Sequence, residues 1–275
     1  MALEIKVTSH RIGGNPGGKC VVRDAKTESL GYFKFCYGSR IEGYSPFVAA
    51  NQPVYEAITF ELARRLGLKT PSTFVLLNDQ KDVRFTNWKE FANTQQAHDP
   101  SGRRFYFVSK LIPHPIVPDV ETKSRSLLEM QKPYLESLLI SDIINIKQNF
   151  AFYNNGAVGE VKYIDLGCSF VHAKEGFLQQ PNRLRIMDFN AVRPMSKNLR
   201  RHTIISADND FFINTEEFVI SIHDMCVPTL NPLGSMRTKD LISVEEIKHI
   251  VYYVMQGFTD SLKSYEQKGL LLKSA

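Results

Sequence analysis

Two polar residues flank a stretch of the chain that has the pattern of a β-hairpin. Mostly aromatic and β-branched residues occupy 150–153 and 161–164, on either side of an Asn-Asn-Gly turn at 154–156. This pattern is typical of two antiparallel strands joined by a tight turn. Asn149 directly precedes the first of these strands and Asp165 follows the second, so the hairpin is expected to place them opposite each other, with Cβ atoms about 5 Å apart. Oxygen donors at that spacing suit Mg²⁺ that carries nucleotide phosphates; the alternative is a hairpin whose two polar ends are simply solvated.

A glycine-rich segment lies between the first two predicted strands. It contains Gly13, Gly14, Gly17 and Gly18, and glycine lets backbone N–H groups approach phosphate oxygens closely. The segment is not a Walker A loop, because no helix and no Lys-Ser/Thr pair follow it. It is therefore either a phosphate-binding loop of another kind or a structural turn between strands.

A lysine lies in the middle of an aromatic strand pattern. In the run Tyr32-Phe33-Lys34-Phe35, alternation puts the two phenylalanines on one face and Lys34 on the other. Glu56, in the first turns of the following predicted helix, is the natural ion-pair partner for Lys34. In protein kinases a strand lysine held in this way contacts the nucleotide phosphates. The alternative is a surface lysine whose ammonium group simply reaches water.

The order of these features along the chain carries more weight than any of them alone. A glycine-rich loop, a strand lysine, a helix glutamate, an asparagine and a later aspartate follow one another as in protein kinases. With these residues the chain resembles the HipA-like kinases, distant relatives of protein and phosphoinositide kinases, and especially their compact forms. The resemblance covers residues 10–170, and the matching segments are 13–19, 32–35, 55–71 and 163–169.

The resemblance implies a fold, a reaction and roles for particular residues. The fold would be α+β and bilobal, like that of protein kinases, with a small β-rich N-lobe and a mostly helical C-lobe. The reaction would be ATP-dependent phosphorylation of serine or threonine in a protein substrate, by a toxin with a matching antitoxin or by a bacterial effector. Lys34 would hold ATP phosphates, Glu56 would hold Lys34, and Asn149 and Asp165 would bind Mg²⁺ (or Mn²⁺). The backbone from Ser109 to Leu111 would form the interlobe hinge near the adenine.

The catalytic loop departs from the pattern of the superfamily. Relatives usually carry an aspartate five residues before the metal-binding asparagine, and Ile144 occupies that position here. Asp142 lies seven residues before Asn149 and would replace the missing base if the loop is rewound; otherwise it is a structural acid. A kinase without a general base loses about 10²–10⁴-fold in rate but keeps positioning and electrostatic stabilisation. The sequence therefore leaves open an atypical kinase and a pseudokinase that binds nucleotide without transferring phosphate. A third hypothesis is phosphorylation of a small molecule or lipid, which no sequence feature favours.

Secondary-structure patterns predict the elements that would position these residues. Strands are expected over 5–7, 20–23, 32–36, 74–77 and 104–109, forming one five-stranded sheet. A helix capped by Asn51, with Pro53 in its first turn, is expected to run to Leu66, where Gly67 stops it. Further helices are expected over 122–131, 134–145, 216–226 and from Ser243, where Ser243 and Glu246 match a capping box. The expected organisation is an N-lobe over 1–112, a proline-containing hinge or connector over 113–120 and a C-lobe over 121–275, with the site between the lobes.

Composition limits the alternatives. The 275 residues are 43% hydrophobic and 23% charged, with a net charge of +5, which is ordinary for a soluble globular protein. Four scattered cysteines argue against zinc and a disulfide framework, and no apolar run is long enough for a membrane span. We expect a protein of the cytoplasm, or an effector secreted into a host cytosol, and no direct binding of nucleic acid. A polyanion activator is a further hypothesis, motivated by basic residues that cluster in the sequence: Arg183, Arg185, Arg193, Lys197, Arg200 and Arg201.

Overall fold

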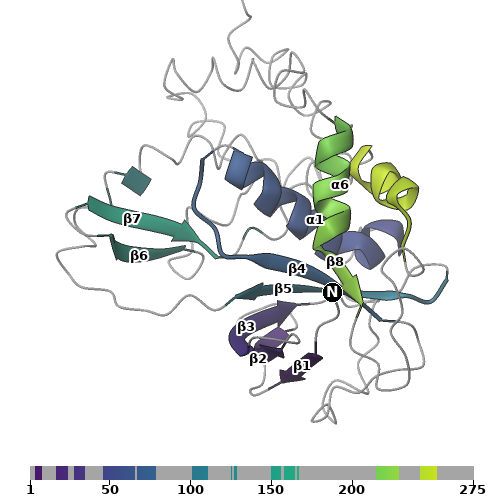
Figure 1. Ribbon diagram of the computed structural model, residues 1–275, viewed down its shortest axis with the longest axis horizontal. Coiled ribbons are helices and arrows are strands. Elements are labelled where there is room, and N and C mark those ends of the chain that lie inside the picture. Colours follow the sequence, from purple (N-terminus) through teal and green to yellow (C-terminus); the bar gives the residue numbers. More distant parts are fainter. Residues whose placement is uncertain are drawn as a thin grey trace, which may run out of the picture. The chain divides into compact units, whose positions relative to one another are not determined.

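The computed structural model describes the secondary-structure core of the chain. The described residues are 4–7, 17–23, 28–34, 46–65, 67–78, 101–110, 125, 127–128, 150–155, 158–164, 166, 215–228 and 242–252. They form an α+β structure with a mainly antiparallel sheet, a separate hairpin and a small number of helical segments (Figure 1). No helix within these ranges is long and apolar enough to cross a membrane.

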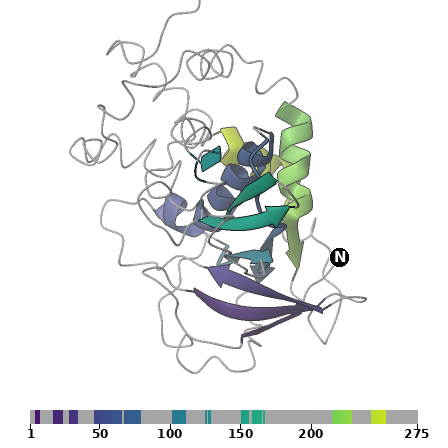
Figure 2. The ribbon, with the colours of Figure 1, turned by 90° about the vertical axis from the view of Figure 1, so that its left-hand side faces the viewer.

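The main sheet has six strands in the order β1-β2-β3-β5-β4-β8. Its strands are β1 (Glu4–Val7), β2 (Gly17–Arg23), β3 (Glu28–Lys34), β4 (Thr73–Asn78), β5 (Arg104–Lys110) and β8 (Cys226–Pro228). The first three form an antiparallel meander, seen side by side as the purple strands of Figure 2, and β5 lies between β3 and β4. All five predicted strands are present, although β3 begins four residues earlier than expected.

The sixth strand, β8, was not predicted from the sequence. Its three residues follow directly after helix α6 (Thr215–Met225) and pair parallel to β4, with Val75 opposite Cys226. Three residues are too few to display strand alternation, and their partner is about 150 positions away in the chain. The pairing is therefore a non-local feature that local patterns do not encode.

Strand β5 is largely buried within the sheet. Its residues from Phe105 to Val108 are all at most 3% exposed. Consecutive buried residues along a strand mean that both of its faces are covered. This central position makes β5 a fixed reference for the lysine on the neighbouring β3.

Helix α1 (Pro46–Arg65) begins earlier than predicted. Asn51 is not its N-cap, and Pro53 lies in the helix interior rather than in the first turn. The first helical residue is Pro46, which suits an N-terminal position because its φ angle is already helical. Every residue from 51 to 60 is buried, so tertiary packing offsets the hydrogen bond that Pro53 cannot donate.

The C-terminal end of α1 is closed by a Schellman motif. Gly67 has a φ angle of +78° and donates its N–H to the carbonyl of Arg64 (2.9 Å), while Leu68 donates to Ala63 (2.9 Å). Glycine adopts this left-handed conformation without the steric cost that a Cβ adds. The prediction that Gly67 ends the helix is confirmed.

The two later helices also follow the sequence patterns. Helix α6 was predicted within one residue of its observed bounds. Residues 244–252 are helical, and the capping box before them is formed: the Glu246 carboxylate accepts from the Ser243 N–H (2.8 Å), and the Ser243 hydroxyl accepts from the Glu246 N–H (3.2 Å). The described residues of the predicted 122–131 helix, 125 and 127–128, are helical as well.

The chain forms two compact units. The first contains residues 1–58, 71–112 and 219–250 and includes the six-stranded sheet; the second contains residues 59–70, 113–218 and 251–275. The hairpin of β6 (Phe150–Asn155) and β7 (Val158–Tyr163) belongs to the second unit. The predicted lobe and hinge boundaries remain a prediction.

Candidate functional site

Lys34 is the last residue of β3 and lies between two neighbouring strands. In the sheet register it is opposite Gly17 of β2 and Phe107 of β5. The expected alternation is present, since Phe33 is 1% exposed whereas Tyr32 and Lys34 are partly exposed. The strand therefore directs Lys34 away from the face on which Phe33 is buried.

The expected ion pair between Lys34 and Glu56 is present. The Lys34 Nζ atom lies 2.7 Å from Oε1 of Glu56, and the two side chains are 18% and 1% exposed. Such a buried carboxylate is tolerated because the Lys34 cation, bonded to Oε1, compensates much of its lost hydration. Helix α1 therefore fixes Lys34 through Glu56, while the lysine keeps some contact with solvent.

An aromatic ring borders the lysine. The Nζ atom of Lys34 lies 6.0 Å from the ring centroid of Phe107, at the limit for a cation–π attraction. Phe107 itself is 1% exposed, so one side of the ammonium group faces an apolar wall. A cation in such surroundings attracts an anionic ligand more strongly than it would in bulk water.

The glycine-rich segment is divided between loop and strand. Gly17 and Gly18 are the first two residues of β2, opposite Lys34 and Phe33, so the expectation of four glycines in one loop is corrected. The backbone of both glycines is part of the β2–β3 pairing. Gly13 and Gly14 lie outside the described residues.

The predicted hinge begins inside the sheet. Ser109 is 4% exposed and lies in β5 opposite Tyr32 and Thr73, and the next residue, Lys110, donates its N–H to the carbonyl of Ser72 (2.9 Å). Leu111 lies outside the described residues. The hinge role of Ser109 and Leu111 remains a prediction.

The β6–β7 hairpin is present, with a register that differs by one residue from the symmetric arrangement. Phe150 pairs with Tyr163, whereas a hairpin that placed Asn149 opposite Asp165 would pair Phe150 with Ile164. The strands are joined at residues 156–157, so Asn154 and Asn155, which were expected in the turn, are the last two residues of β6. A two-residue connection sets the register of the strands that it joins.

The predicted metal ligands are not among the residues that the structure describes. Asn149, Asp165, Asp142 and the Ile144 position all lie outside those ranges. Within the described ranges, no group of three or more His, Cys, Asp or Glu residues is arranged to hold a metal ion. The Mg²⁺ site formed by Asn149 and Asp165 therefore remains a prediction.

Two described cysteines are unsuited to thiolate chemistry. Cys20 and Cys226 are buried and not in disulfides. Burial raises the pKa of each thiol to about 12, and nearby Asp224 adds to the shift at Cys226. Both thiols are protonated at neutral pH, so neither is a nucleophile.

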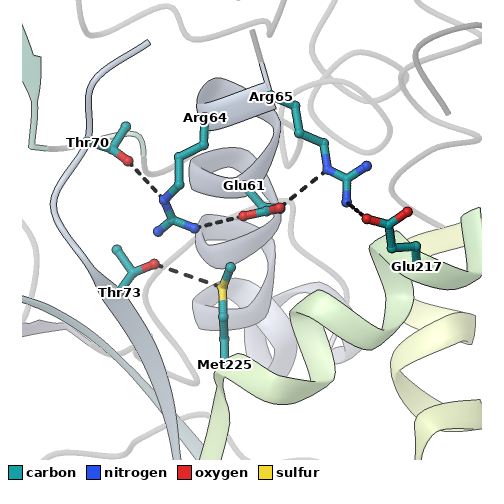
Figure 3. A network of polar contacts seen from close by, with 7 residues as sticks. All are labelled: Glu61, Arg64, Arg65, Thr70, Thr73, Glu217 and Met225. Atoms are coloured by element: carbon teal, nitrogen blue, oxygen red, sulfur yellow. Dashed lines mark hydrogen bonds and ion pairs between the residues drawn. The ribbon is translucent and has the colours of Figure 1, made fainter. Parts of the chain in front are cut away.

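A polar cluster at the C-terminal end of α1 was missed in the sequence (Figure 3). Arg64 donates to Glu61 (2.8 Å) and to the hydroxyl of Thr70 (3.1 Å), and Arg65 donates to the other Glu61 oxygen (3.3 Å). Arg65 also lies 4.0 Å from Glu217 and stacks on Phe218 at 5.0 Å from its ring centroid. The spacing of Glu61, Arg64 and Arg65 would have predicted the contacts within the helix, but nothing local predicts Thr70.

A separate sulfur contact in Figure 3 belongs to the first unit. The hydroxyl of Thr73, on β4, lies 3.9 Å from the sulfur of Met225, the last residue of α6. It occurs at the start of the β4–β8 pairing and joins segments that are 152 positions apart. The contact supports the placement of β8 beside β4.

Comparison with known proteins gives distant similarities. No protein-family model matches the chain. It is 23% identical over 211 residues to UDP-glucuronate:xylan alpha-glucuronosyltransferase 2 of Arabidopsis thaliana, an alignment that covers 72% of this chain and spans only 35% of that relative's length. A solved structure, WaaP in complex with acyl carrier protein, aligns with 81% of this chain and 89% of that chain at 12% identity. Its TM-score of 0.29 is too low to carry an argument about the fold.

Proposed function

We propose that this chain is an ATP- and Mg²⁺-dependent phosphotransferase, a serine/threonine protein kinase of the HipA-like type with an atypical catalytic loop. The observation that carries the proposal is the ion pair between Lys34 Nζ and the buried Glu56 at 2.7 Å. Kinases require a strand lysine held by a helix glutamate to position the nucleotide phosphates. Here the two residues come from β3 and α1, in the order and on the types of element that this chemistry needs.

Each residue of the proposed site has a physical task. Lys34 places its positive charge against the phosphates, and Glu56 keeps the lysine side chain in one conformation so that little entropy is lost when nucleotide binds. Gly13 and Gly14 offer backbone close to the phosphates, Gly17 and Gly18 begin the strand that follows, and the backbone of Ser109 and Leu111 binds the adenine edge. Asn149 and Asp165 hold Mg²⁺ (or Mn²⁺), which neutralises charge on the transferred phosphoryl group.

The proposed biological setting follows from the resemblance in residues 10–170. The substrate would be a protein, and the enzyme would act as a toxin or as a bacterial effector, in the cytoplasm or in a host cytosol. An antitoxin or a polyanion that orders the catalytic loop would regulate it. The glucuronosyl transfer in the name of the plant relative is not proposed for this chain, because that alignment reaches only 23% identity over 35% of the relative.

The second candidate is a pseudokinase. Ile144, at the position where relatives carry the catalytic aspartate, favours it, because isoleucine cannot accept a substrate proton or orient a hydroxyl. Such a protein would bind nucleotide through Lys34 and regulate a partner without transferring phosphate. The kinase is favoured if Asp142 takes the position of the missing base, and the pseudokinase is favoured if it does not.

Transfer of labelled γ-phosphate separates the two candidates. The wild type is incubated with labelled ATP, Mg²⁺ or Mn²⁺ and a generic protein substrate, beside Asp165→Ala, Asp142→Ala and a partly exposed control, Lys248→Met. A kinase incorporates label in the wild type and the control but not in Asp165→Ala, and loss in Asp142→Ala as well would identify the replacement base. Nucleotide binding without incorporation would contradict the kinase and leave the pseudokinase.

A further inference from the structure

Residues 67–70, which connect α1 to β4, are held at several points within the second unit. The Schellman motif fixes Gly67 and Leu68, and the Arg64 guanidinium donates to the Thr70 hydroxyl at 3.1 Å. Between these points, the carbonyl of Lys69 accepts the N–H of Tyr163 at 2.9 Å, and Lys69 forms a parallel bridge with Lys162. The end of α1 is thus attached directly to the β6–β7 hairpin.

The attachment occurs at the open end of the hairpin and not at its turn. Tyr163 is the last residue of β7, is 0% exposed and pairs with Phe150, the first residue of β6. The chain reaches Asn149 one residue before Phe150 and Asp165 two residues after Tyr163. The backbone bond from Lys69 therefore acts on the hairpin end that leads into both proposed metal ligands.

Arg64 bonds to the connection on both sides of Lys69. Its backbone carbonyl accepts from Gly67, and its guanidinium spans from Glu61 on the helix to Thr70, so residues 67–70 are enclosed between two bonds from one residue. Figure 3 shows Arg64 directed toward Thr70, whereas Arg65 is directed toward Glu217. The Arg64 side chain is 30% exposed and that of Glu61 is 15% exposed, so these bonds are partly shielded from water.

We propose that Arg64, acting through Thr70 and Lys69, is a positioning residue for the metal-binding end of the β6–β7 hairpin. The inference rests on the proposed function, because the hairpin ends matter chemically only if Asn149 and Asp165 bind Mg²⁺. Loosening residues 67–70 weakens the bond between Lys69 and Tyr163 and lets the hairpin end fluctuate. Metal binding by two residues on that end then becomes less favourable, while contacts of the nucleotide with Lys34 are unaffected.

Substitutions at Arg64 and Thr70 test the role, and Arg65 provides a matched control. Arg64→Met keeps the apolar stem and removes the guanidinium, and Thr70→Val removes only the hydroxyl that accepts its hydrogen bond. Arg65→Met removes the neighbouring guanidinium, which shares Glu61 but is directed to Glu217 and Phe218 and not to Thr70. The measurements are the Mg²⁺ concentration that gives half-maximal enhancement of ATP binding, the affinity for ATP in EDTA, and hydrogen exchange of peptides covering 150–163.

A positioning role for Arg64 predicts a pattern of results that a merely structural role would not produce. Arg64→Met and Thr70→Val should each raise the half-maximal Mg²⁺ concentration by about three- to tenfold, the effect of one partly shielded hydrogen bond. Both should speed exchange near Tyr163 and leave the affinity for metal-free ATP unchanged. Arg64→Lys, which retains the charge and one donor, should restore part of the Mg²⁺ response, and Arg65→Met should match the wild type.

Two results would overturn the proposal, and they are distinguishable. Faster exchange in Arg64→Met with an unchanged Mg²⁺ response would show that the residue supports the fold and not the metal site. A wild type that shows no Mg²⁺-dependent binding of ATP would overturn the proposed function itself, and the inference with it, before any variant is compared.

Discussion

At the scale of single residues, a buried acid fixes the position of the lysine proposed to bind phosphate. Glu56 is 1% exposed and contacts Lys34 at 2.7 Å. A charge buried this deeply is favourable only while its partner remains, because removal of either residue leaves the other poorly solvated. The pair therefore links the stability of the fold to the chemistry of the proposed site.

Neutralising Glu56 should destabilise the protein. We expect Glu56→Gln to lower the free energy of unfolding by about 3 kcal/mol, the lower end of the range for broken buried pairs, because Lys34 retains some solvent contact. Urea unfolding followed by circular dichroism measures this. Glu217→Gln is the control, since Glu217 is 65% exposed and 4.0 Å from its partner, and such a pair contributes about 0–1 kcal/mol. Equal effects of the two substitutions would contradict the importance of the Lys34–Glu56 pair.

Glu246 should make stability depend on acid pH. The hydrogen bond from Arg103, together with bonds from Ser243, lowers the pKa of Glu246 from its ordinary 4.5 to about 2. Because the folded pKa is below the unfolded one, this stabilisation is complete above pH 4.5 and is lost as the pH falls toward 2. The side chain is 45% exposed, so solvent screening limits the effect to on the order of 1 kcal/mol.

The comparison of the wild type with Glu246→Gln isolates this contribution. Urea unfolding at pH 5 and at pH 3 should show a larger loss of stability in the wild type than in the variant. Because the interaction with Arg103 is the largest cause of the lowered Glu246 pKa, added salt should reduce the difference in stability loss between the two proteins. Parallel pH profiles for the two proteins would show that Glu246 contributes nothing through its charge.

At the scale of elements, the sequence predicts two helix ends correctly. Gly67 ends α1, and Ser243 with Glu246 begins the helix over 244–252, both as expected. These features depend on residues within a few positions of each other, so short-range pattern is sufficient to predict them. The same two ends carry contacts to distant segments, through Tyr163 in one case and Arg103 in the other.

Gly67 should tolerate asparagine better than alanine. Its φ angle is +78°, and a Cβ at this position would meet no atom within 4 Å, so only backbone strain is at stake. We expect Gly67→Ala to cost about 1 kcal/mol in the free energy of unfolding and Gly67→Asn clearly less, because asparagine enters the left-handed region more readily. Thermal unfolding of both variants measures this, and equal losses would mean that the helix end can relax.

What the sequence did not reveal has a common physical origin. The start of α1 at Pro46 depends on tertiary burial of residues 51–60, which outweighs the local signals at Asn51 and Pro53. The strand β8 depends on pairing with β4, and the hairpin register on a two-residue connection. The pair of Lys34 and Glu56 was predictable because strand alternation places the lysine on the face opposite Phe33, and the order of kinase-like features indicates Glu56 as its partner. The bond from Arg64 to Thr70 was not predictable, because it depends on how the chain turns after Gly67.

At the scale of the whole molecule, each compact unit is assembled from segments far apart in the sequence. The unit that contains the sheet includes residues 219–250, and the other includes residues 59–70. Helix α1 contributes residues to both units, as do α6 and the helix over 244–252. A single cut in the chain therefore does not give two intact units, because it removes segments from at least one of them.

A fragment that ends at residue 112 should not fold cooperatively. It lacks Val219, Ile222 and Ile247, which are each at most 2% exposed, as well as β8. Full burial of each such side chain contributes about 1.5–3 kcal/mol, and the sum is comparable with the entire stability of about 5–15 kcal/mol typical of a domain. Thermal unfolding of residues 1–112 should therefore be broad and noncooperative when compared with that of the full chain. A sharp transition of the fragment would contradict this.

The role of Lys34 in nucleotide binding is tested by measuring the affinity for ATP by calorimetry, with and without Mg²⁺. The proteins compared are the wild type, Lys34→Met, Lys34→Arg and Lys248→Met, and circular dichroism checks that each is folded. If Lys34 and Glu56 form the phosphate-binding part of a nucleotide site, the wild type and Lys248→Met bind ATP more tightly with Mg²⁺. Lys34→Met then loses about tenfold or more in affinity, as expected for one charged contact, and Lys34→Arg loses less. Equal affinity in the wild type and in a folded Lys34→Met, or no binding in the wild type, would contradict the account.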